Sequence, residues 1–291
     1  MPTGAQAVEN TDSPFPSVSQ LSDDSLFSPA TPGPAGIDAA PIQLVSFLTE
    51  GGPQINQGVV WRIFTPDEAG GSPNLIKQFK TATPVIELPP GVYMINVAFG
   101  LAHLTRRVEI APGSQRIEKF VINAGGLRVI IKPSSDIFSG PINATFDLYS
   151  DERDQFGNRQ NIMSTMRPGR ITRLNSGIYR IVSRLGDANA IVASEVTVEA
   201  GKLTEATVLH EAAKVTFKLV QSAGGDALAD AQWVILNRSS DKVVKKTAGA
   251  LPTHIFAPGD YAIRASWEGN TYESDFTVKS GQNIEVEVLM R

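Results

Sequence analysis

The feature that most constrains the fold of this chain is a phrase that occurs three times. Each copy contains Gly-x-Tyr, and the Tyr begins a run in which apolar residues recur at every second position, with Ser183 of the second copy as the exception. The copies are LPPGVYMINVAFG (88–100), LNSGIYRIVSRLG (174–186) and FAPGDYAIRASWEGN (256–270). In a β-strand, successive side chains point to opposite faces, so a pattern that repeats every two residues puts its apolar residues on one face. The same stretch of β-structure is therefore expected three times.

Two further landmarks keep the same order around each copy. The three tyrosines are separated by 86 and 82 residues, and a Gly follows each of them after 20, 22 and 20 residues. An aromatic residue precedes each Tyr by 32, 33 and 28 residues. Order and spacing that persist over three copies indicate an internal repeat. The landmarks are Trp61, Tyr93 and Gly113; Phe146, Tyr179 and Gly201; Trp233, Tyr261 and Gly281.

The repeat predicts an all-β protein of three tandem antiparallel β-sandwich domains. Helical periodicity is missing from these stretches, and Gly-Gly and Pro-Gly pairs mark turns along the whole body. A chain of 291 residues accommodates three domains of about 80 to 88 residues each. We expect the domains to span 41–124, 125–212 and 213–291.

The Tyr of each phrase is interpreted as a tyrosine corner, which is a structural role. In β-sandwiches, a Tyr near the start of a late strand donates its hydroxyl to the backbone of the preceding turn. The Gly two residues before it permits backbone angles that a tight turn requires. The predicted corner residues are Gly91, Tyr93, Gly177, Tyr179, Gly259 and Tyr261.

Charge and composition separate residues 1–40 from the rest of the chain. These residues carry a net charge of −5, whereas the other 251 carry 26 basic and 25 acidic residues. A nearly neutral body argues against a nucleic-acid-binding protein, which needs clustered basic charge. Residues 8–40 contain five Pro and six Ser without apolar periodicity. This composition predicts a disordered, acidic N-terminal tail.

The tail also contains the sequence's main indication of location. Ala5-Gln6-Ala7 has the A-x-A form of a signal-peptidase site and precedes an acidic, Pro- and Ser-rich stretch. A signal-peptide remnant is one interpretation, and chance occurrence is the other. The chain has no Cys, which fits an oxidising compartment, and no run of 18 apolar residues that would span a membrane. A periplasmic or secreted protein is predicted.

The phrases LPPGVYMINV and VEIAPGSQRIEKFVI resemble the last strands of transthyretin-like, carboxypeptidase-regulatory-like and collagen-adhesin-B-type domains. The resemblance covers the back half of each repeat, and it implies seven-stranded prealbumin- or immunoglobulin-like sandwiches that bacteria string together in envelope proteins. Such motifs are specific for fold rather than activity. Some adhesin domains of this kind carry a Lys–Asn isopeptide bond. Lys214, Lys218 and Asn283 stand in the matching strands of the third repeat, but the first repeat opens without a Lys.

Most residues that suggest chemistry are interpreted as structural. His103, His210 and His254 occupy different places in the repeats and lack a partner at ligand spacing, so no metal site is expected. The loop SDERDQFGNRQN (150–161) predicts a solvated hairpin, with a weak calcium site as the alternative. The stretch RSSDKVVKK (238–246) predicts an edge strand protected by lysines, with an anionic-polymer site as the alternative.

The tryptophans divide into two kinds. Trp61 and Trp233 share one repeat position and are expected in the core, whereas Trp267 at a strand end is the candidate for stacking on a carbohydrate ligand. No G-x-S-x-G, G-x-x-x-x-G-K-[ST] or H-E-x-x-H motif occurs, so no catalytic residue and no cofactor is expected.

These features together predict a non-enzymatic envelope spacer or protein-interaction scaffold. Its partner is expected to be another envelope protein or a cell-wall polymer. The alternative is a carbohydrate-binding protein that recognises peptidoglycan or polysaccharide.

Overall fold

The structure is a computed structural model that describes residues 39–66, 72–113, 115–135 and 143–291. Ala5-Gln6-Ala7 and the predicted tail up to residue 38 lie outside the described residues. The first strand, β1, begins at Ala40, one residue before the predicted domain start. In the described part of the chain, no helix has the length and apolar character needed to cross a membrane.

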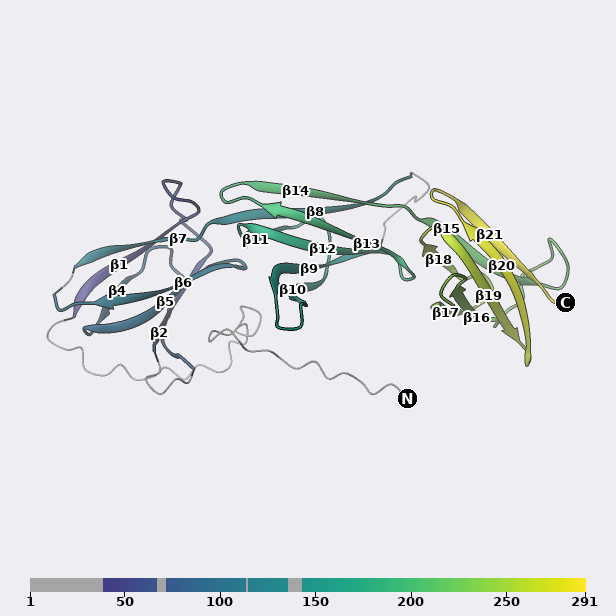
Figure 1. Ribbon diagram of the computed structural model, residues 1–291, viewed down its shortest axis with the longest axis horizontal. Helices are drawn as coiled ribbons and strands as arrows, with labels where there is room; N and C mark the ends of the chain where they lie inside the picture. Colours follow the sequence, from purple (N-terminus) through teal and green to yellow (C-terminus); the bar gives the residue numbers. More distant parts are fainter. Residues whose placement is uncertain (1–38, 67–71, 114, 136–142) are drawn as a thin grey trace. The chain divides into compact units, whose positions relative to one another are not determined.

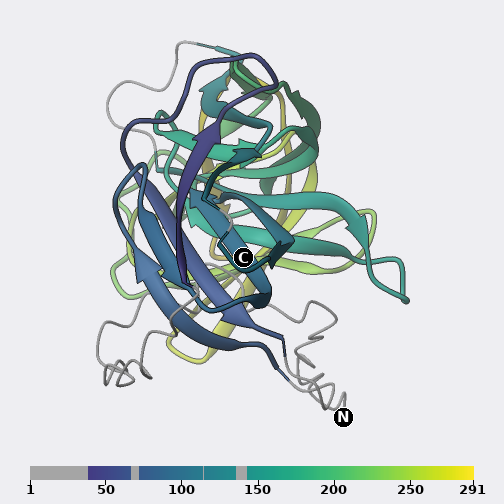
Figure 2. The ribbon, with the colours of Figure 1, turned by 90° about the vertical axis from the view of Figure 1, so that its left-hand side faces the viewer.

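The first sandwich consists of a three-stranded sheet with the order β4-β1-β7 and a four-stranded sheet with the order β3-β2-β5-β6. Figures 1 and 2 show its two layers from two directions. Its strands are β1 (Ala40–Phe47), β2 (Val59–Thr65), β3 (Asn74–Phe79), β4 (Val85–Leu88), β5 (Gly91–Phe99), β6 (Ala102–Ile110) and β7 (Arg116–Val121).

The other two sandwiches repeat this topology strand for strand, with the orders β11-β8-β14 and β10-β9-β12-β13, then β18-β15-β21 and β17-β16-β19-β20. The second contains β8 (Ala124–Pro133), β9 (Ala144–Arg153), β10 (Arg159–Met166), β11 (Ile171–Asn175), β12 (Gly177–Leu185), β13 (Ala190–Val198) and β14 (Leu203–His210). The third contains β15 (Ala213–Val220), β16 (Gln232–Asn237), β17 (Val243–Ala248), β18 (Thr253–Phe256), β19 (Gly259–Trp267), β20 (Asn270–Val278) and β21 (Asn283–Leu289). The prediction of three tandem β-sandwiches is confirmed.

Strand direction adds one feature that the prediction of antiparallel sandwiches missed. The first and last strands of the first sandwich, β1 and β7, pair in parallel, and so do β15 and β21 of the third. Parallel neighbours cannot be joined by a tight hairpin and need a long crossover. Five strands lie between the two partners in the sequence, and they form the long connection that allows the pair to be parallel.

The Gly-x-Tyr phrases form β5, β12 and β19; burial alternates along β12 as predicted, but in β5 Asn96 and Ala98 of the other face are buried as well. In β12, Tyr179, Ile181, Ser183 and Leu185 are buried, whereas Arg180 is exposed. One face of the strand therefore enters the core and the other faces outward.

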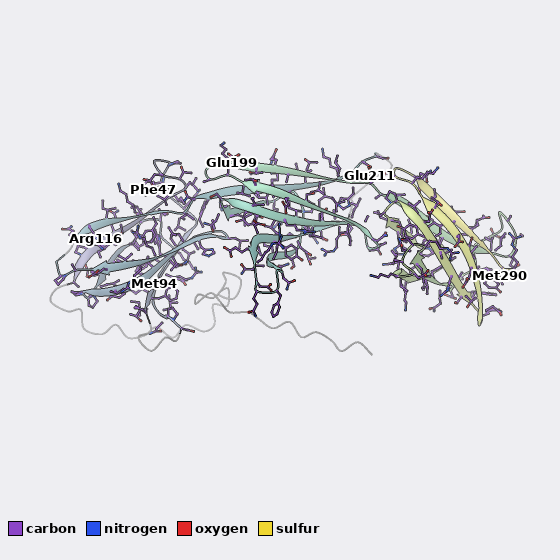
Figure 3. The ribbon with its side chains drawn as sticks, viewed as in Figure 1. Phe47, Met94, Arg116, Glu199, Glu211 and Met290 are labelled. Atoms are coloured by element: carbon purple, nitrogen blue, oxygen red, sulfur yellow. The ribbon has the colours of Figure 1, made fainter. Side chains whose placement is uncertain are left out.

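Trp61 and Trp233 lie in the cores, where they are 0% and 1% exposed, as predicted. Trp61 packs edge-on against Phe120 with ring centroids 5.2 Å apart, and Trp233 lies 5.7 Å from Phe217. Each indole N–H also has a backbone acceptor, Ala82 O for Trp61 and Gly249 O for Trp233. Phe146 is buried at the same place in the second sandwich. Figure 3 shows side chains filling the space between the layers.

The core of the second sandwich contains a polar pair. Ser183 and His210 are 0% and 1% exposed, and Ser183 Oγ lies 2.6 Å from His210 Nε2. Burial lowers the pKa of His210, and its Nδ1 is buried with no hydrogen-bond partner among the described residues. From the sequence, His210 is interpreted as a structural residue without a partner at ligand spacing. It ends β14, and the register of its strand turns it into the core.

The chain divides into two compact units. The first holds the first sandwich together with residues 172–176 and 198–203. The second holds the rest of the second sandwich and all of the third.

Candidate functional site

The predicted corner tyrosines stand at the starts of β5, β12 and β19. Tyr93 donates its hydroxyl to Pro89 O at 2.9 Å, and Tyr261 donates its own to Ala257 O at 2.8 Å. Burial raises the pKa of Tyr93, Tyr179 and Tyr261, so each hydroxyl keeps its proton at neutral pH. The glycines two residues earlier all have positive φ: 159° at Gly91, 157° at Gly177 and 152° at Gly259.

The loop at residues 150–161 is the turn of the hairpin formed by β9 and β10, which confirms the hairpin prediction. In Figure 1 this hairpin projects from its sheet. Asp154 closes the turn, because its Oδ1 accepts hydrogen bonds from the backbone N–H groups of Phe156 (2.9 Å) and Asn158 (2.8 Å). These bonds, above all the one from Asn158, lower the pKa of Asp154. Asp151 pairs with Arg159 instead, so this geometry gives the calcium alternative no support.

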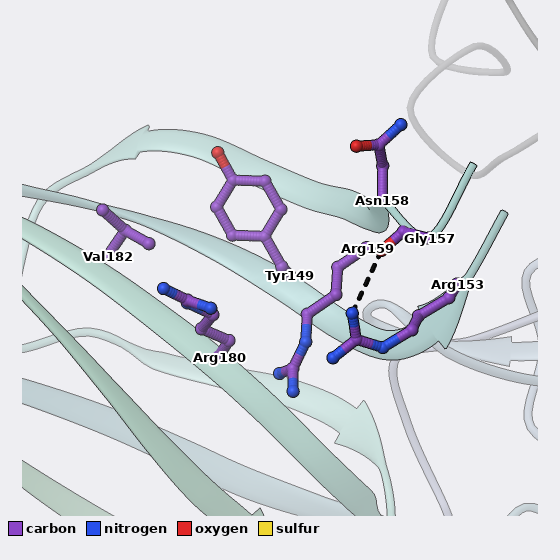
Figure 4. A pocket seen from close by; sticks show the side chains of 7 residues that line it. All are labelled: Tyr149, Arg153, Gly157, Asn158, Arg159, Arg180 and Val182. Carbon is purple, nitrogen blue, oxygen red and sulfur yellow. Dashed lines mark hydrogen bonds between the residues drawn. The ribbon is translucent and has the colours of Figure 1, made fainter.

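A pocket of about 320 Å³ lies beside this turn. It opens on the outer face of the four-stranded sheet, where Tyr149 of β9 stands opposite Arg180 of β12. In the view of Figure 4, the Arg153 and Arg159 side chains end near each other, whereas the Arg180 side chain extends toward Val182. The residues that line the pocket are Tyr149, Arg153, Gly157, Asn158, Arg159, Arg180 and Val182.

Arg159 is the most buried of the three arginines, with a side chain that is 11% exposed. Its Nη2 contacts Glu195 Oε1 at 2.6 Å and Asp151 Oδ1 at 3.0 Å. Its Nε and Nη1 are buried and have no hydrogen-bond partner among the described residues. An unpaired buried N–H is costly, and more so on a charged group. The charge of Arg159 is thus only partly compensated.

The other two arginines are more accessible. Arg153 Nη1 donates to Gly157 O at 3.0 Å across the hairpin, the hydrogen bond drawn in Figure 4. Arg180 is exposed, and within the described ranges it has no hydrogen bond and no ion pair. Arg159 is thus paired with Asp151 and Glu195, and the carboxylate of Asp154 in the same turn is engaged by Phe156 N and by Asn158. Arginine's planar set of donors matches carboxylate and phosphate oxygens, so the pocket attracts an oxyanion.

Sequence reasoning singled out the hairpin loop but missed this pocket. The signal available was the outward face of the Gly-x-Tyr strand, which carries Arg180 and Arg184 where β5 has Met94 and Ala98. The sequence does not reveal the register in which β12 pairs with β9. That register places Arg180 opposite Tyr149, which lies 31 positions earlier in the chain.

Trp267, the candidate for carbohydrate stacking, is half-buried at the end of β19. Its side chain packs against the core of its own sandwich, and its Nε1 donates to Ala229 O at 3.0 Å. One edge of the indole is thereby held by the sandwich. Ligand stacking at Trp267 stays a prediction.

The other predicted candidates have local partners. His103 Nδ1 lies 3.1 Å from Leu101 O, and His254 Nδ1 lies 2.9 Å from Asp187. In the part of the chain that the structure describes, no three His, Cys, Asp or Glu side chains form a group that could hold a metal ion.

The basic stretch contains β17, which is an edge strand as predicted. Lys245, however, is half-buried and pairs with Asp187 at 2.7 Å, so it is not a free edge lysine. Lys214 and Asn283 are exposed partners in the parallel register of β15 and β21. Lys218 reaches two carboxylates, Glu285 and Glu287, each at 3.5 Å.

Comparison with known families gives one match. The model described as the Rhizobiales growth-associated tandem repeat domain matches residues 214–290, which hold nearly all of the third sandwich. Its description as a tandem repeat agrees with three sandwiches of one topology in this chain. The chain is built of tandem β-sandwich repeats. A comparison with curated protein sequences found no match.

Solved structures similar to this chain include bacterial pilins. The Bacillus anthracis TIE protein is 18% identical, with a TM-score of 0.25; the match covers 87% of this chain, which spans half of that protein. GBS52, the minor pilin of Streptococcus agalactiae, is 13% identical over 59% of this chain and 95% of its own, with a TM-score of 0.32. A streptococcal ancillary pilin is 12% identical over 87% of this chain and 100% of its own, with a TM-score of 0.29. The fold assignment rests on the strand pairing of this chain itself.

Proposed function

We propose that this protein is a non-enzymatic interaction scaffold of the cell envelope, periplasmic or secreted, with repeats at 41–124, 125–212 and 213–291. The observation that carries the proposal is a built contact between one repeat and the next. A scaffold that presents surfaces in a set order needs specific contacts at its junctions, whereas a flexible linker provides only a tether.

The first such contact involves the turn between β5 and β6. Leu101 N donates to Arg173 O at 3.0 Å, and the Arg173 guanidinium lies 4.2 Å from the centre of the Phe99 ring. Asn175 adds hydrogen bonds to both backbone groups of His103, at 3.1 Å each. These contacts combine backbone pairing with a cation–π interaction.

The matching turn between β12 and β13 contacts the third sandwich. Asn189 Nδ2 donates to the Tyr261 hydroxyl at 2.8 Å, and Asn189 Oδ1 accepts from Ala257 N at 3.1 Å. Asp187 binds Lys245 and His254 at 2.7 and 2.9 Å. The junction thus adds a partner to the corner tyrosine of the following repeat.

Both turns have Gly seven residues after the corner Tyr, at a left-handed φ of 67° for Gly100 and 72° for Gly186. A Cβ on Gly100 would lie 2.9 Å from Arg173 Cβ, and one on Gly186 would lie 2.7 Å from Ile255 Cβ. Such distances are shorter than carbon atoms tolerate, so glycine allows the close approach as well as the turn.

The test is Gly186→Ala in the full chain, with Gly269→Ala as the matched control. Gly269 stands in the equivalent turn of the third sandwich with φ of 82°, and nothing lies within 4 Å of its added Cβ. Both variants therefore strain the backbone, but only Gly186→Ala disturbs the junction. Calorimetry is expected to show the second and third sandwiches melting together in the native chain and in Gly269→Ala, and separately in Gly186→Ala.

Two results would contradict the proposal. Separate melting of the two sandwiches in the native chain would show that the junction does not couple them. Recovery of the natural gene product in the cytosolic fraction would refute the envelope location, which rests on Ala5-Gln6-Ala7 and the missing cysteines.

A further inference from the structure

We propose that the arginine pocket and the neighbouring hairpin tip of the second sandwich bind an acidic segment of a partner protein. The proposal rests on the scaffold function and names the chemistry of the partner. The residues that carry it are Arg153, Arg159 and Arg180 in the pocket, and Phe156 at the tip.

The pocket contains arginine N–H groups that have no partner among the described residues. Arg180 has no polar partner within the described ranges, and Arg159 keeps two buried N–H atoms without one. By contrast, Arg184 on the same face of β12 forms an ion pair, because its Nη1 lies 2.7 Å from Asp147 Oδ2. A bound carboxylate would form charge-assisted hydrogen bonds with Arg180, for which no carboxylate partner is found within the described ranges.

The hairpin turn beside the pocket displays an exposed apolar side chain. Phe156 is 78% exposed, which makes it the most exposed large hydrophobic residue in the part of the chain that the structure describes. It sits one residue before Gly157, which lines the pocket, and Asp154 holds its backbone N–H. A rigid turn that displays an aromatic ring beside arginines has the residue types that dominate binding energy at protein interfaces.

Arginines beside an exposed phenylalanine favour a protein segment over other oxyanions as the ligand. A phosphate or a sugar acid would use the arginines but leave Phe156 unused. A peptide with glutamates flanking an apolar side chain would use both. The pocket, at about 320 Å³, has room for a side-chain carboxylate.

The experiment measures binding of a fluorescein-labelled peptide with alternating Glu and Leu to the full chain by anisotropy. The same peptide with Gln in place of Glu is the charge control. Arg180→Glu and Phe156→Ser test the two parts of the site, and both residues are exposed, so neither change should disturb the core. Arg170→Glu is the matched control, because Arg170 is also exposed on this sandwich but does not line the pocket.

Arg180→Glu is expected to weaken binding of the acidic peptide about tenfold or more, because a like charge replaces an attractive one. Phe156→Ser is expected to weaken it about threefold to tenfold, and Arg170→Glu less than twofold. Raising the salt concentration should weaken binding of the acidic peptide and leave the Gln peptide unaffected.

Three outcomes would overturn the proposal. One is equal binding of the Glu and Gln peptides, and another is an equal loss in Arg170→Glu and Arg180→Glu. The third is inorganic phosphate or an acidic polysaccharide occupying the pocket more tightly than the peptide, with Phe156→Ser having no effect. If the peptide does not bind but the second and third sandwiches melt together, the scaffold proposal stands and only the peptide site is refuted. If the peptide binds but the two sandwiches of the native chain melt separately, only the scaffold proposal is refuted.

Discussion

Replacing both Ser183 and His210 by the apolar residues of the other sandwiches is expected to leave the second sandwich about as stable as before, although Ser183→Ala alone destabilises it. The register places Ser183 opposite Phe146, just as Val97 and Ala265 stand opposite Trp61 and Trp233. His210 follows its landmark Gly by nine residues, as Ile122 and Met290 do. The test variants are therefore Ser183→Ala, His210→Ile and the two combined.

The magnitudes follow from what each change leaves behind. Ser183→Ala removes the hydroxyl that lies 2.6 Å from His210 Nε2 and leaves a buried polar nitrogen, at a cost of about 1–3 kcal/mol. His210→Ile should cost less, because Ser183 Oγ retains Val192 O at 3.4 Å. Removing both partners leaves no unpaired group, and such paired replacements are nearly neutral. The two changes should therefore be strongly non-additive.

The same pair predicts a pH dependence. Burial lowers the pKa of His210 from its ordinary value of 6.5, so the unfolded chain takes up the proton at a higher pH than the folded chain does. Stability from neutral His210 is therefore complete above pH 6.5 and is lost as the pH falls below it. The double variant should not show this loss.

The assay has to report on the second sandwich alone. The chain's three tryptophans are Trp61, Trp233 and Trp267, none of which lies in that sandwich, so tryptophan fluorescence is unsuitable. Hydrogen exchange of peptides from β12, corrected for intrinsic rates, measures its opening free energy directly. Ser183→Ala should reduce protection by about 5- to 150-fold. Additive effects, or an unchanged fall in protection between pH 7 and 5 in the double variant, would refute the reasoning.

Two other predictions concern hydrogen bonds to the backbone. Tyr261→Phe removes a hydroxyl that serves Ala257 and Asn189, and it should destabilise the third sandwich by about 1–3 kcal/mol; an unchanged urea midpoint of Trp233 fluorescence would argue against a corner role. Burial alone would raise the pKa of Asp147. Hydrogen bonds from the Thr165 backbone N–H and from Arg184 outweigh the effect of burial, so the pKa is lowered. Asp147 therefore adds stability above pH 3.8 that is lost as the pH falls further. Asp147→Ala should cost about 1–3 kcal/mol at pH 7 by hydrogen exchange, and a difference that persists unchanged at low pH would contradict this assignment.

The sequence by itself determined the kind of fold and the number of repeats. Period-two alternation is a local property, because neighbouring side chains in a strand must face opposite ways whatever the strand pairs with. The Gly-x-Tyr phrase, the downstream Gly and the upstream aromatic residue are local too, so their spacing was enough to count the sandwiches. The burial of Trp61 and Trp233 followed from the same pattern, since a large apolar ring at a repeated strand position has only the core to fill.

Only the tertiary structure decided which strands lie side by side, and the chemistry depends on that choice. The parallel pairing of β1 with β7 joins strands that begin 76 positions apart, and no local pattern encodes it. The pocket arises because β9 and β12 pair in a register that sets Arg180 beside Tyr149, while the hairpin brings Arg159 back across Asp151. The Ser183–His210 pair likewise joins opposite sheets of one sandwich. A shift of one residue in either register would send these side chains to the other face, because in a sheet the side-chain period is two.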